Sequence, residues 1–171
     1  MATSSASARA TSRPSRDERK RPHRRYPSWR PRLSEQTDRG GMHMPGELET
    51  ITRQMFSALD RNDVESFITR ATGDVQAVDE ISRCWLRGMG EAGDYLRKVI
   101  KQIQAVRSTI SNVRESVWSE AGVVTCWLEQ DYTFEGKNQH VSAPTTIVFR
   151  RENGAWKIAV VESIPLPVDS A

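Results

Sequence analysis

The sequence predicts an α+β fold in which three helices on the N-terminal side pack on one face of a curved antiparallel sheet. Apolar residues recur at helical spacing through much of residues 47–106, whereas apolar and polar residues alternate, as in strands, through most of residues 109–164. Turn signals that contain glycine divide the second region into long strands. The expected order is two helices, two short strands, a long helix and four long antiparallel strands.

Three helices are expected in the first half of the domain. The first covers about 47–61, where apolar residues follow helical spacing. The second starts at Asn62, where Glu65 completes a variant of the capping box, and it ends at Gly73. The third covers about 91–106, and its apolar stripe comprises Ala92, Tyr95, Leu96, Val99, Ile100, Ile103 and Val106.

The long strands end at recognisable signals. Glu135-Gly136 predicts a two-residue hairpin, and Glu152–Gly154 predicts a three-residue loop whose glycine takes the left-handed conformation. Pro165 and Pro167 stop the last strand, because proline donates no hydrogen bond to a ladder. The expected strands are 74–79, 83–87, 109–118, 123–134, 140–151 and 156–164.

These turns determine which residues share a face, because side chains alternate along a strand. One face combines large apolar groups with ionisable ones, and we expect the helices to cover it and leave a pocket for a small ligand. The other face is mostly apolar and is expected to make packing or subunit contacts. The mixed face would contain Thr125, Trp127, Glu129, Asp131, His140, Thr146, Val148, Trp156, Ile158, Val160 and Glu162, and the apolar face Cys126, Leu128, Tyr132, Ala143, Thr145, Ile147, Phe149, Ala159 and Val161.

The length and composition fit one globular domain. The chain has 171 residues, of which 37% are hydrophobic. No apolar run approaches the roughly 18 residues of a membrane span, and the N-terminus lacks the apolar core of a secretory signal. Cys84 and Cys126 form neither a CxxC pair nor a metal-binding pattern, and Cys126 is expected to be a small buried residue. These features predict a cytoplasmic protein without membrane contact.

Charge divides the chain into two parts. Residues 1–44 contain 11 Lys and Arg but only 4 Asp and Glu, whereas residues 45–171 contain 14 basic and 18 acidic residues. The first part is rich in Ser, Arg and Pro without a hydrophobic period, which predicts a disordered tail. Its arginines, with Tyr26 and Trp29, could contact nucleic acid weakly. The alternatives are a solvated tail without a partner, a start codon placed too early, or a transit peptide.

Several segments carry a family resemblance. The runs FSALDRNDVESF and GDVQAVDE, a glycine before the third helix, and the run TTIVFRRENGAWKIAVVESIP resemble the SnoaL-like branch of the nuclear transport factor 2-like superfamily over about 46–167. The resemblance implies a cone-shaped sheet with three helices on its concave face, as in cystatin-like folds. It also implies a homodimer formed through the sheet, and no metal or nucleotide cofactor. The superfamily holds isomerases, polyketide cyclases, dehydratases and transport factors, so the resemblance selects no single activity.

The ketosteroid isomerase branch can be compared residue by residue. Its general-base aspartate matches Asp79, but its oxyanion-hole tyrosine falls at Met55 and its protonated aspartate falls at Thr146. Many SnoaL-like sequences have a histidine where Glu162 stands. The isomerase mechanism needs a base and two strong donors, so the resemblance does not extend to a complete steroid-isomerase site.

Asp79 leads the candidate site residues. It is either a pocket carboxylate that acts as a general base or a strand-end residue that accepts hydrogen bonds from the amides of the following turn. Asp131 and His140 would face each other across the hairpin, as an acid–base pair or as a solvated ion pair near the tip. Glu129 and Glu162 would project into the pocket, either in structural ion pairs or as catalytic groups.

Three tryptophans are interpreted as pocket wall and core, with contact to a flat ligand as the functional alternative. The sequence shows no Gly-rich phosphate loop, metal-ligand cluster or nucleophile elbow, which leaves kinase, metalloenzyme and serine hydrolase functions unsupported. The expected pocket residues are Met55, Trp85, Trp127, Glu129, Thr146, Val148, Trp156 and Val160, and the expected catalytic residues are Asp79, Glu162, His140 and Asp131.

The leading expectation is an apolar pocket that binds a small, flat hydrophobic molecule without a cofactor. The first alternative is an isomerase, cyclase or dehydratase in which Asp79 is the general base, assisted by Glu162 or by the Asp131–His140 pair. The second alternative is a dimeric scaffold or interaction module. A deep cavity favours binding or catalysis, and a filled interior favours the scaffold.

Overall fold

The computed structural model describes residues 44–165. The predicted tail, apart from Met44, lies outside this range. The elements are α1 (Glu47–Asp60), α2 (Val64–Ile68), β1 (Ala71–Asp79), β2 (Leu86–Arg87), α3 (Gly88–Val99), β3 (Ile103–Trp118), β4 (Ala121–Phe134), β5 (Lys137–Glu152) and β6 (Ala155–Ser163). This order confirms the predicted α+β class. None of the helices in residues 44–165 is long and apolar enough to cross a membrane.

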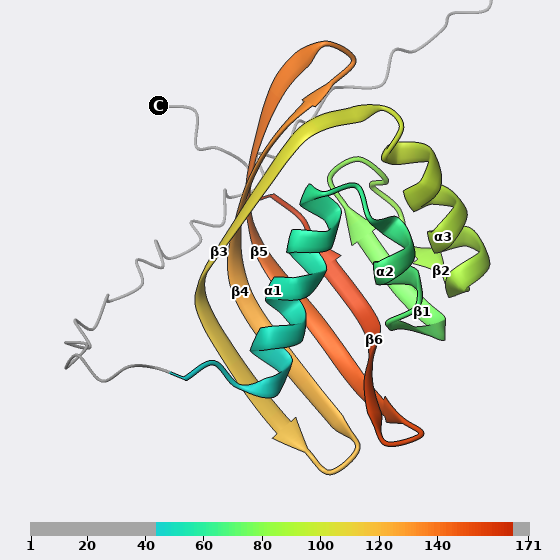
Figure 1. Ribbon diagram of the computed structural model, residues 1–171, viewed down its shortest axis with the longest axis vertical. Helices are drawn as coiled ribbons and strands as arrows, with labels where there is room; N and C mark the ends of the chain where they lie inside the picture. Colours follow the sequence, from blue (N-terminus) through green and yellow to red (C-terminus); the bar gives the residue numbers. More distant parts are fainter. Residues whose placement is uncertain (1–43, 166–171) are drawn as a thin grey trace, which may run out of the picture. The chain divides into compact units, whose positions relative to one another are not determined.

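The six strands form one mixed sheet in the order β2-β1-β6-β5-β4-β3. Neighbouring strands are antiparallel except β1 and β6, which run parallel. The sheet is curved, and the helices lie on its concave side (Figure 1). The parallel pairing sets Asp79, the last residue of β1, beside Ser163, the last residue of β6. This pairing therefore places two polar residues together at one end of the covered face.

The starts of α1 and α2 are stabilised by acidic side chains near their first turns. In α1, Glu47 and Glu49 lie in the first turn, where the helix dipole favours negative charge. In α2, the cap is Asp63, whose side chain accepts a hydrogen bond from the Ser66 amide at 3.1 Å. The predicted cap at Asn62 is one residue before the observed cap, Asp63, and the helix begins at Val64. Its predicted end at Gly73 is wrong, because β1 already begins at Ala71.

The predicted third helix is too long, because it takes the start of β3 for helix. The helix ends at Val99, and Ile103 and Val106 belong to β3. The pairing of β3 with β4 shifts by one residue between Gln104 and Arg107. An extra residue in a strand brings side chains three positions apart to one face, which imitates helical spacing. A second shift follows between Ser111 and Arg114, with Ala105 and Asn112 at positive φ.

The two predicted hairpin turns have different outcomes. Glu135-Gly136 forms the predicted two-residue turn between Phe134 and Lys137. The predicted three-residue loop is wrong, because Glu152 pairs with Ala155 and only two residues intervene. Those residues are Asn153 and Gly154, at φ 53° and 81°, and Asn-Gly is the pair that such tight turns favour. A register shift then leaves Ala159 as an extra residue in β6.

The predicted assignment of the sheet faces is also wrong. The helices cover the mostly apolar face, because an antiparallel sheet with one solvated face buries its more apolar side. Within residues 44–165, the helices lie on the other side of the sheet, so the mixed face carries none of them. Trp156 and Ile158 change to the covered face, because the tight turn alters the register before the bulge restores it. The buried residues of the covered face include Val124, Cys126, Leu128, Ala143, Ile147, Phe149, Trp156 and Ile158.

Candidate functional site

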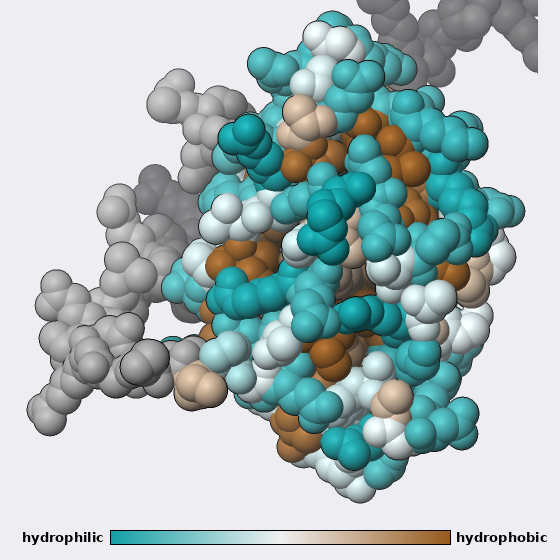
Figure 2. Space-filling model, viewed as in Figure 1, coloured by the Kyte–Doolittle hydropathy of each residue, from teal (hydrophilic) through white to brown (hydrophobic). Residues whose placement is uncertain are grey.

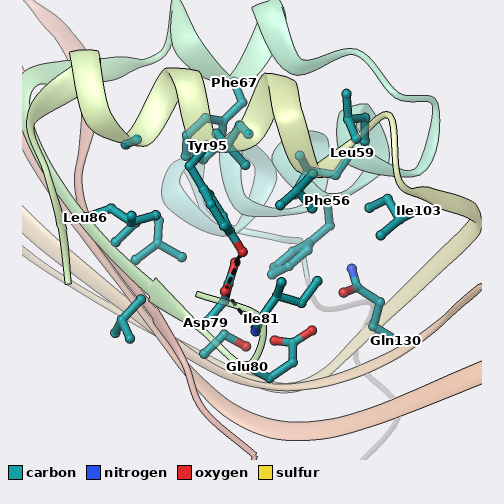
Figure 3. A pocket seen from close by; sticks show the side chains of 18 of the residues that line it. Phe56, Leu59, Phe67, Asp79, Glu80, Ile81, Leu86, Tyr95, Ile103 and Gln130 are labelled. Atoms are coloured by element: carbon teal, nitrogen blue, oxygen red, sulfur yellow. Dashed lines mark hydrogen bonds between the residues drawn. The ribbon is translucent and has the colours of Figure 1, made fainter. Parts of the chain in front are cut away.

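A cavity of about 120 Å³ lies between the helices and the covered face of the sheet. Most of its wall is apolar, with side chains from both helical and strand segments (Figure 3). Viewed from the helix side, the surface is mainly hydrophilic, with hydrophobic areas showing between the polar side chains (Figure 2). One of these areas lies beside the connection from α3 to β3. Ile100 in this connection and Ile103, the first residue of β3, both line the cavity.

The polar part of the wall is confined to a few residues. No lysine, arginine or histidine occurs among the described residues that line the cavity. Its two carboxyl groups are therefore not balanced by a cationic side chain within the wall. The polar lining residues are Asp79, Glu80, Tyr95, Gln130 and Ser163.

Asp79 is held by the turn that follows β1 and by α3. Its Oδ1 accepts hydrogen bonds from the backbone amides of Ile81 at 3.1 Å and Ser82 at 2.7 Å. The Tyr95 hydroxyl lies 2.8 Å from Oδ1 and 2.9 Å from Oδ2, and its single proton serves either oxygen. Figure 3 shows Tyr95 reaching from α3 to this carboxyl across the cavity. Asp79 thus accepts hydrogen bonds from the turn and also lines the cavity, and its role as a general base stays a prediction.

Glu80 is the second carboxyl of the cavity. The Tyr132 hydroxyl donates to its Oε1 at 3.2 Å. Burial, together with the neighbouring charge of Asp79, raises the pKa of Glu80 above its ordinary range. In Figure 3 the carboxyl lies on the same side of the cavity as the Gln130 amide. The Glu80 carboxyl therefore holds its proton more tightly than an exposed glutamate does.

The two tyrosines act as hydrogen-bond donors. Burial raises the pKa of Tyr95, and the charge of Asp79 raises it further. Burial and the charge of Glu80 act in the same way on the pKa of Tyr132. Both phenols consequently stay protonated throughout the neutral pH range, and their O–H groups donate hydrogen bonds to the carboxyl groups.

The structure brings only two of the sequence-predicted site residues to this cavity. Asp79 and Met55 line it. Trp156 is buried under α1, where its indole donates to Glu47 at 3.1 Å, and Trp85 is 41% exposed. Glu162 is exposed. The uncovered face carries the remaining predicted residues, Trp127, Glu129, Asp131, His140, Thr146, Val148 and Val160, together with Glu162.

Asp131 and His140 pair directly across the β4–β5 hairpin, as predicted. His140 Nδ1 lies 2.7 Å from Asp131 Oδ1, and this hydrogen bond raises the pKa of the imidazole. His140 Nε2 lies 3.1 Å from Glu129, which also accepts from Trp127 Nε1 and from Ser142 Oγ. The His140 and Asp131 side chains are 59% and 69% exposed, so their geometry is that of a solvated ion pair.

Sequence reasoning misses most polar groups of the cavity. It places Tyr95 only in an apolar helix stripe, although a tyrosine hydroxyl that is buried needs a partner. It does not select Glu80, because alternation along a strand would place this side chain on the opposite face from Asp79. However, β1 ends at Asp79, so Glu80 lies in the following turn, where alternation no longer applies. Gln130 could be predicted as a cavity residue only if the covered face of β4 were assigned correctly. Within the described residues, no group of His, Cys, Asp and Glu is arranged to hold a metal ion.

Comparisons with known proteins agree on the fold. One similar structure, from Streptomyces avermitilis, is provisionally named a dehydratase of the nuclear transport factor 2-like family, with TM-score 0.65 and 19% identity over 71% of this chain and 95% of that chain. Another, from Novosphingobium aromaticivorans, is provisionally named a scytalone dehydratase, with TM-score 0.63 and 13% identity over 70% and 82%. A protein with a cystatin-like fold from Caulobacter vibrioides gives TM-score 0.63 and 15% identity over 72% and 89%. The comparison with curated proteins gave no match.

The family follows from a match that spans most of the folded domain. The model of the SnoaL-like domain matches residues 48–167, which is well over half of the sequence. The similar structures share the fold of this chain at TM-scores of 0.65 and 0.63. The chain therefore belongs to the SnoaL-like domain family of the nuclear transport factor 2-like superfamily.

Proposed function

We propose that the cavity binds a small, mainly hydrophobic organic molecule. The observation that carries this proposal is an apolar cavity of about 120 Å³ whose few polar groups lie together. An apolar cavity of about 150 Å³ is known to hold benzene, so this one fits a ligand of about one ring. A larger ligand would need the helices to move away from the sheet.

Burial of hydrocarbon alone would give only weak binding. A ring-sized molecule buries on the order of 150–250 Å², similar to an aromatic side chain. At about 25 cal/mol per Å², this burial contributes roughly 4–6 kcal/mol before the cost of association. A dissociation constant of 1 mM corresponds to about 4 kcal/mol, so once the cost of association is subtracted a plain hydrocarbon should bind no more tightly than the millimolar range. Tighter ligands must use the polar groups as well.

A pair of neighbouring valines offers a direct test. Val161 lines the cavity, whereas Val160 lies on the uncovered face. We expect Val161→Phe to fill the cavity and abolish the chemical-shift changes that toluene produces in the wild-type protein. Val160→Phe should leave these changes intact. Absence of toluene binding to the wild type, or equal loss in both variants, would contradict the proposal.

A second candidate function is proton transfer at carbon, as in an isomerase, cyclase or dehydratase. It is supported by two adjacent carboxyl groups in an apolar cavity and by the raised pKa of Glu80, which is a common setting for general acid–base catalysis. Asp79 remains the proposed base, with Glu80 as the proton donor. Similar structures provisionally named dehydratases are consistent with this candidate.

Catalysis would be tested by removing each carboxyl separately. Asp79→Asn keeps an oxygen for the turn amides, and Glu80→Gln keeps one for Tyr132. We expect either substitution to abolish turnover of a substrate found by screening, while binding of that substrate changes less. Unchanged turnover in both variants would exclude this role for the two carboxyls.

A further inference from the structure

The polar end of the cavity has more acceptors than donors. The Tyr95 hydroxyl already donates its hydrogen bond to Asp79, and the Tyr132 hydroxyl donates to Glu80. Gln130 donates one N–H of its Nε2 to Ser108 Oγ at 2.8 Å, which leaves its second N–H as a donor and its carbonyl oxygen as an acceptor. A ligand that occupies the cavity would therefore meet carboxyl and amide oxygens, and a ligand with its own acceptor would find few protons.

The charges in the wall lead to the same conclusion. Asp79 and Glu80 are neighbours in sequence, and both line the cavity. Their charges repel each other, and none of the described lining residues is cationic. Glu80 has one hydrogen bond to its carboxyl from another side chain among residues 44–165, from Tyr132. A cationic ligand would relieve this repulsion, and an anionic one would increase it.

From this arrangement we infer that the ligand is a small hydrophobic amine, bound as its ammonium ion against Glu80, with the apolar part in the cavity. An ammonium group has three donors and no acceptor. The oxygens available to it are those of the Glu80 carboxyl, the carbonyl of Gln130, and Oδ2 of Asp79, which shares one proton with Oδ1. The apolar wall then accommodates about one ring. This inference rests on the proposed function and specifies its ligand.

Four compounds of one shape separate the contributions to binding. Toluene, benzyl alcohol, benzylamine and benzoate carry the same ring with no polar group, a neutral donor, a cation or an anion. We expect the affinities, measured by NMR titration at pH 7.5, to fall in the order benzylamine, benzyl alcohol, toluene, benzoate. A hydrogen-bonded charge pair adds about 1.5–3 kcal/mol, so benzylamine should bind about ten- to a hundredfold more tightly than toluene.

Substitution of Glu80 tests whether its carboxyl is the group that favours benzylamine over toluene. Glu80→Gln should weaken benzylamine binding at least about tenfold and leave toluene binding unchanged. The matched control is Glu120→Gln, because Glu120 is an exposed residue outside the cavity lining. This control should leave all four affinities unchanged. If Glu80→Gln does not alter benzylamine binding, Glu80 is not the partner of the ligand and the inference is wrong.

The affinity for benzylamine should also depend on pH. The titratable groups that face Glu80 are Asp79 at the end of β1, Tyr95 on α3 and Tyr132 on β4, and α1, β3 and β6 contribute none to the cavity lining. The raised pKa means that much of Glu80 is protonated at pH 4.5, where a cation has less to bind. We expect benzylamine binding to weaken from pH 7.5 to pH 4.5 in the wild type, and less so in Glu80→Gln. Toluene binding should show no such change.

The outcomes distinguish this inference from the proposed function. If toluene binds as tightly as benzylamine, or benzoate binds comparably, the cavity binds small molecules without the amine preference and the inference alone is overturned. If none of the four compounds binds, the proposed function fails and the inference fails with it. The predicted order of affinities supports both.

Discussion

Asp79 belongs to a turn and to a cavity wall at the same time. Its carboxyl accepts from two turn amides and from the half-buried Tyr95 hydroxyl. Asp79→Ala would leave these donors without their partner, and we expect it to lower the free energy of unfolding by about 1–3 kcal/mol. Asp79→Asn should cost less, because its carbonyl oxygen can still accept. Urea denaturation measures both losses, and a stable Asp79→Ala variant would show that the turn does not depend on these bonds.

Glu80 should make the stability of the fold depend on pH. Its pKa is raised in the folded protein, so the folded state binds a proton more tightly than the unfolded state does. Stability from this residue is therefore greatest below its unfolded pKa of about 4.3 and falls as the pH rises through the folded pKa. Glu80→Gln should remove this loss, so the variant should gain stability relative to wild type between pH 4 and pH 7. A constant difference across this range would contradict the prediction.

The two cysteines should differ in reactivity. Cys126 is buried as predicted, and burial raises the pKa of its thiol to about 11, whereas Cys84 is exposed. Because the thiolate is the reactive form, we expect iodoacetamide at pH 8 to label Cys84 rapidly and Cys126 only after unfolding. Peptide mass mapping of the native protein measures this difference. Equal labelling rates would mean that the sheet opens readily around Cys126.

At the scale of the elements, two glycines have opposite roles. Gly154 has φ 81° in the β5–β6 turn, whereas Gly90 lies within α3, where an added Cβ would meet open space. Gly154→Ala should destabilise the fold by about 1 kcal/mol, because alanine is strained at positive φ. Gly90→Ala should stabilise it by about 0.4–1 kcal/mol, because the unfolded chain loses freedom. Thermal unfolding of the two variants measures shifts of opposite sign.

The helices, strands and first hairpin can be predicted because their signals are local. The bulges cannot be predicted in this way, and they account for the main errors. A one-residue shift at Ala105 gives Ile103 and Val106 the spacing of a helix, and the extra Ala159 conceals the two-residue turn at Asn153-Gly154. Alternation predicts which residues share a face only between bulges.

The candidate site is only partly predictable for a related reason. Asp79 and Met55 are located because a family resemblance points to their positions. The choice of the mixed face as the pocket face is wrong, since the free energy of burial favours covering the apolar face. Tyr95 and Glu80 come from a helix and a turn, and their meeting with Asp79 depends on packing between distant segments that no local pattern records.

For the whole molecule, the uncovered sheet face makes dimerisation testable. The homodimer through the sheet stays a prediction of the family resemblance. Val148 lies near the middle of this face, on β5. If two copies meet there, Val148→Glu should convert a dimer to a monomer in sedimentation equilibrium, because it would bury an unpaired charge. Lys101→Glu, at an exposed site after α3, is the control that should stay dimeric. A Val148→Glu dimer would exclude this interface.

The irregular outer strand has a further consequence. Among residues 44–165, β3 is the outermost strand beside β4, and its 16 residues are interrupted by two register shifts. A long, regular edge would offer consecutive free amides and carbonyls to a strand from another molecule, which is how fibrils grow. The register shifts near Ala105 and Asn112 interrupt that edge, and such bulges are one of the devices by which natural sheets resist edge-to-edge pairing. The same irregularities that obscure β3 in the sequence should therefore make this edge a poor template for aggregation.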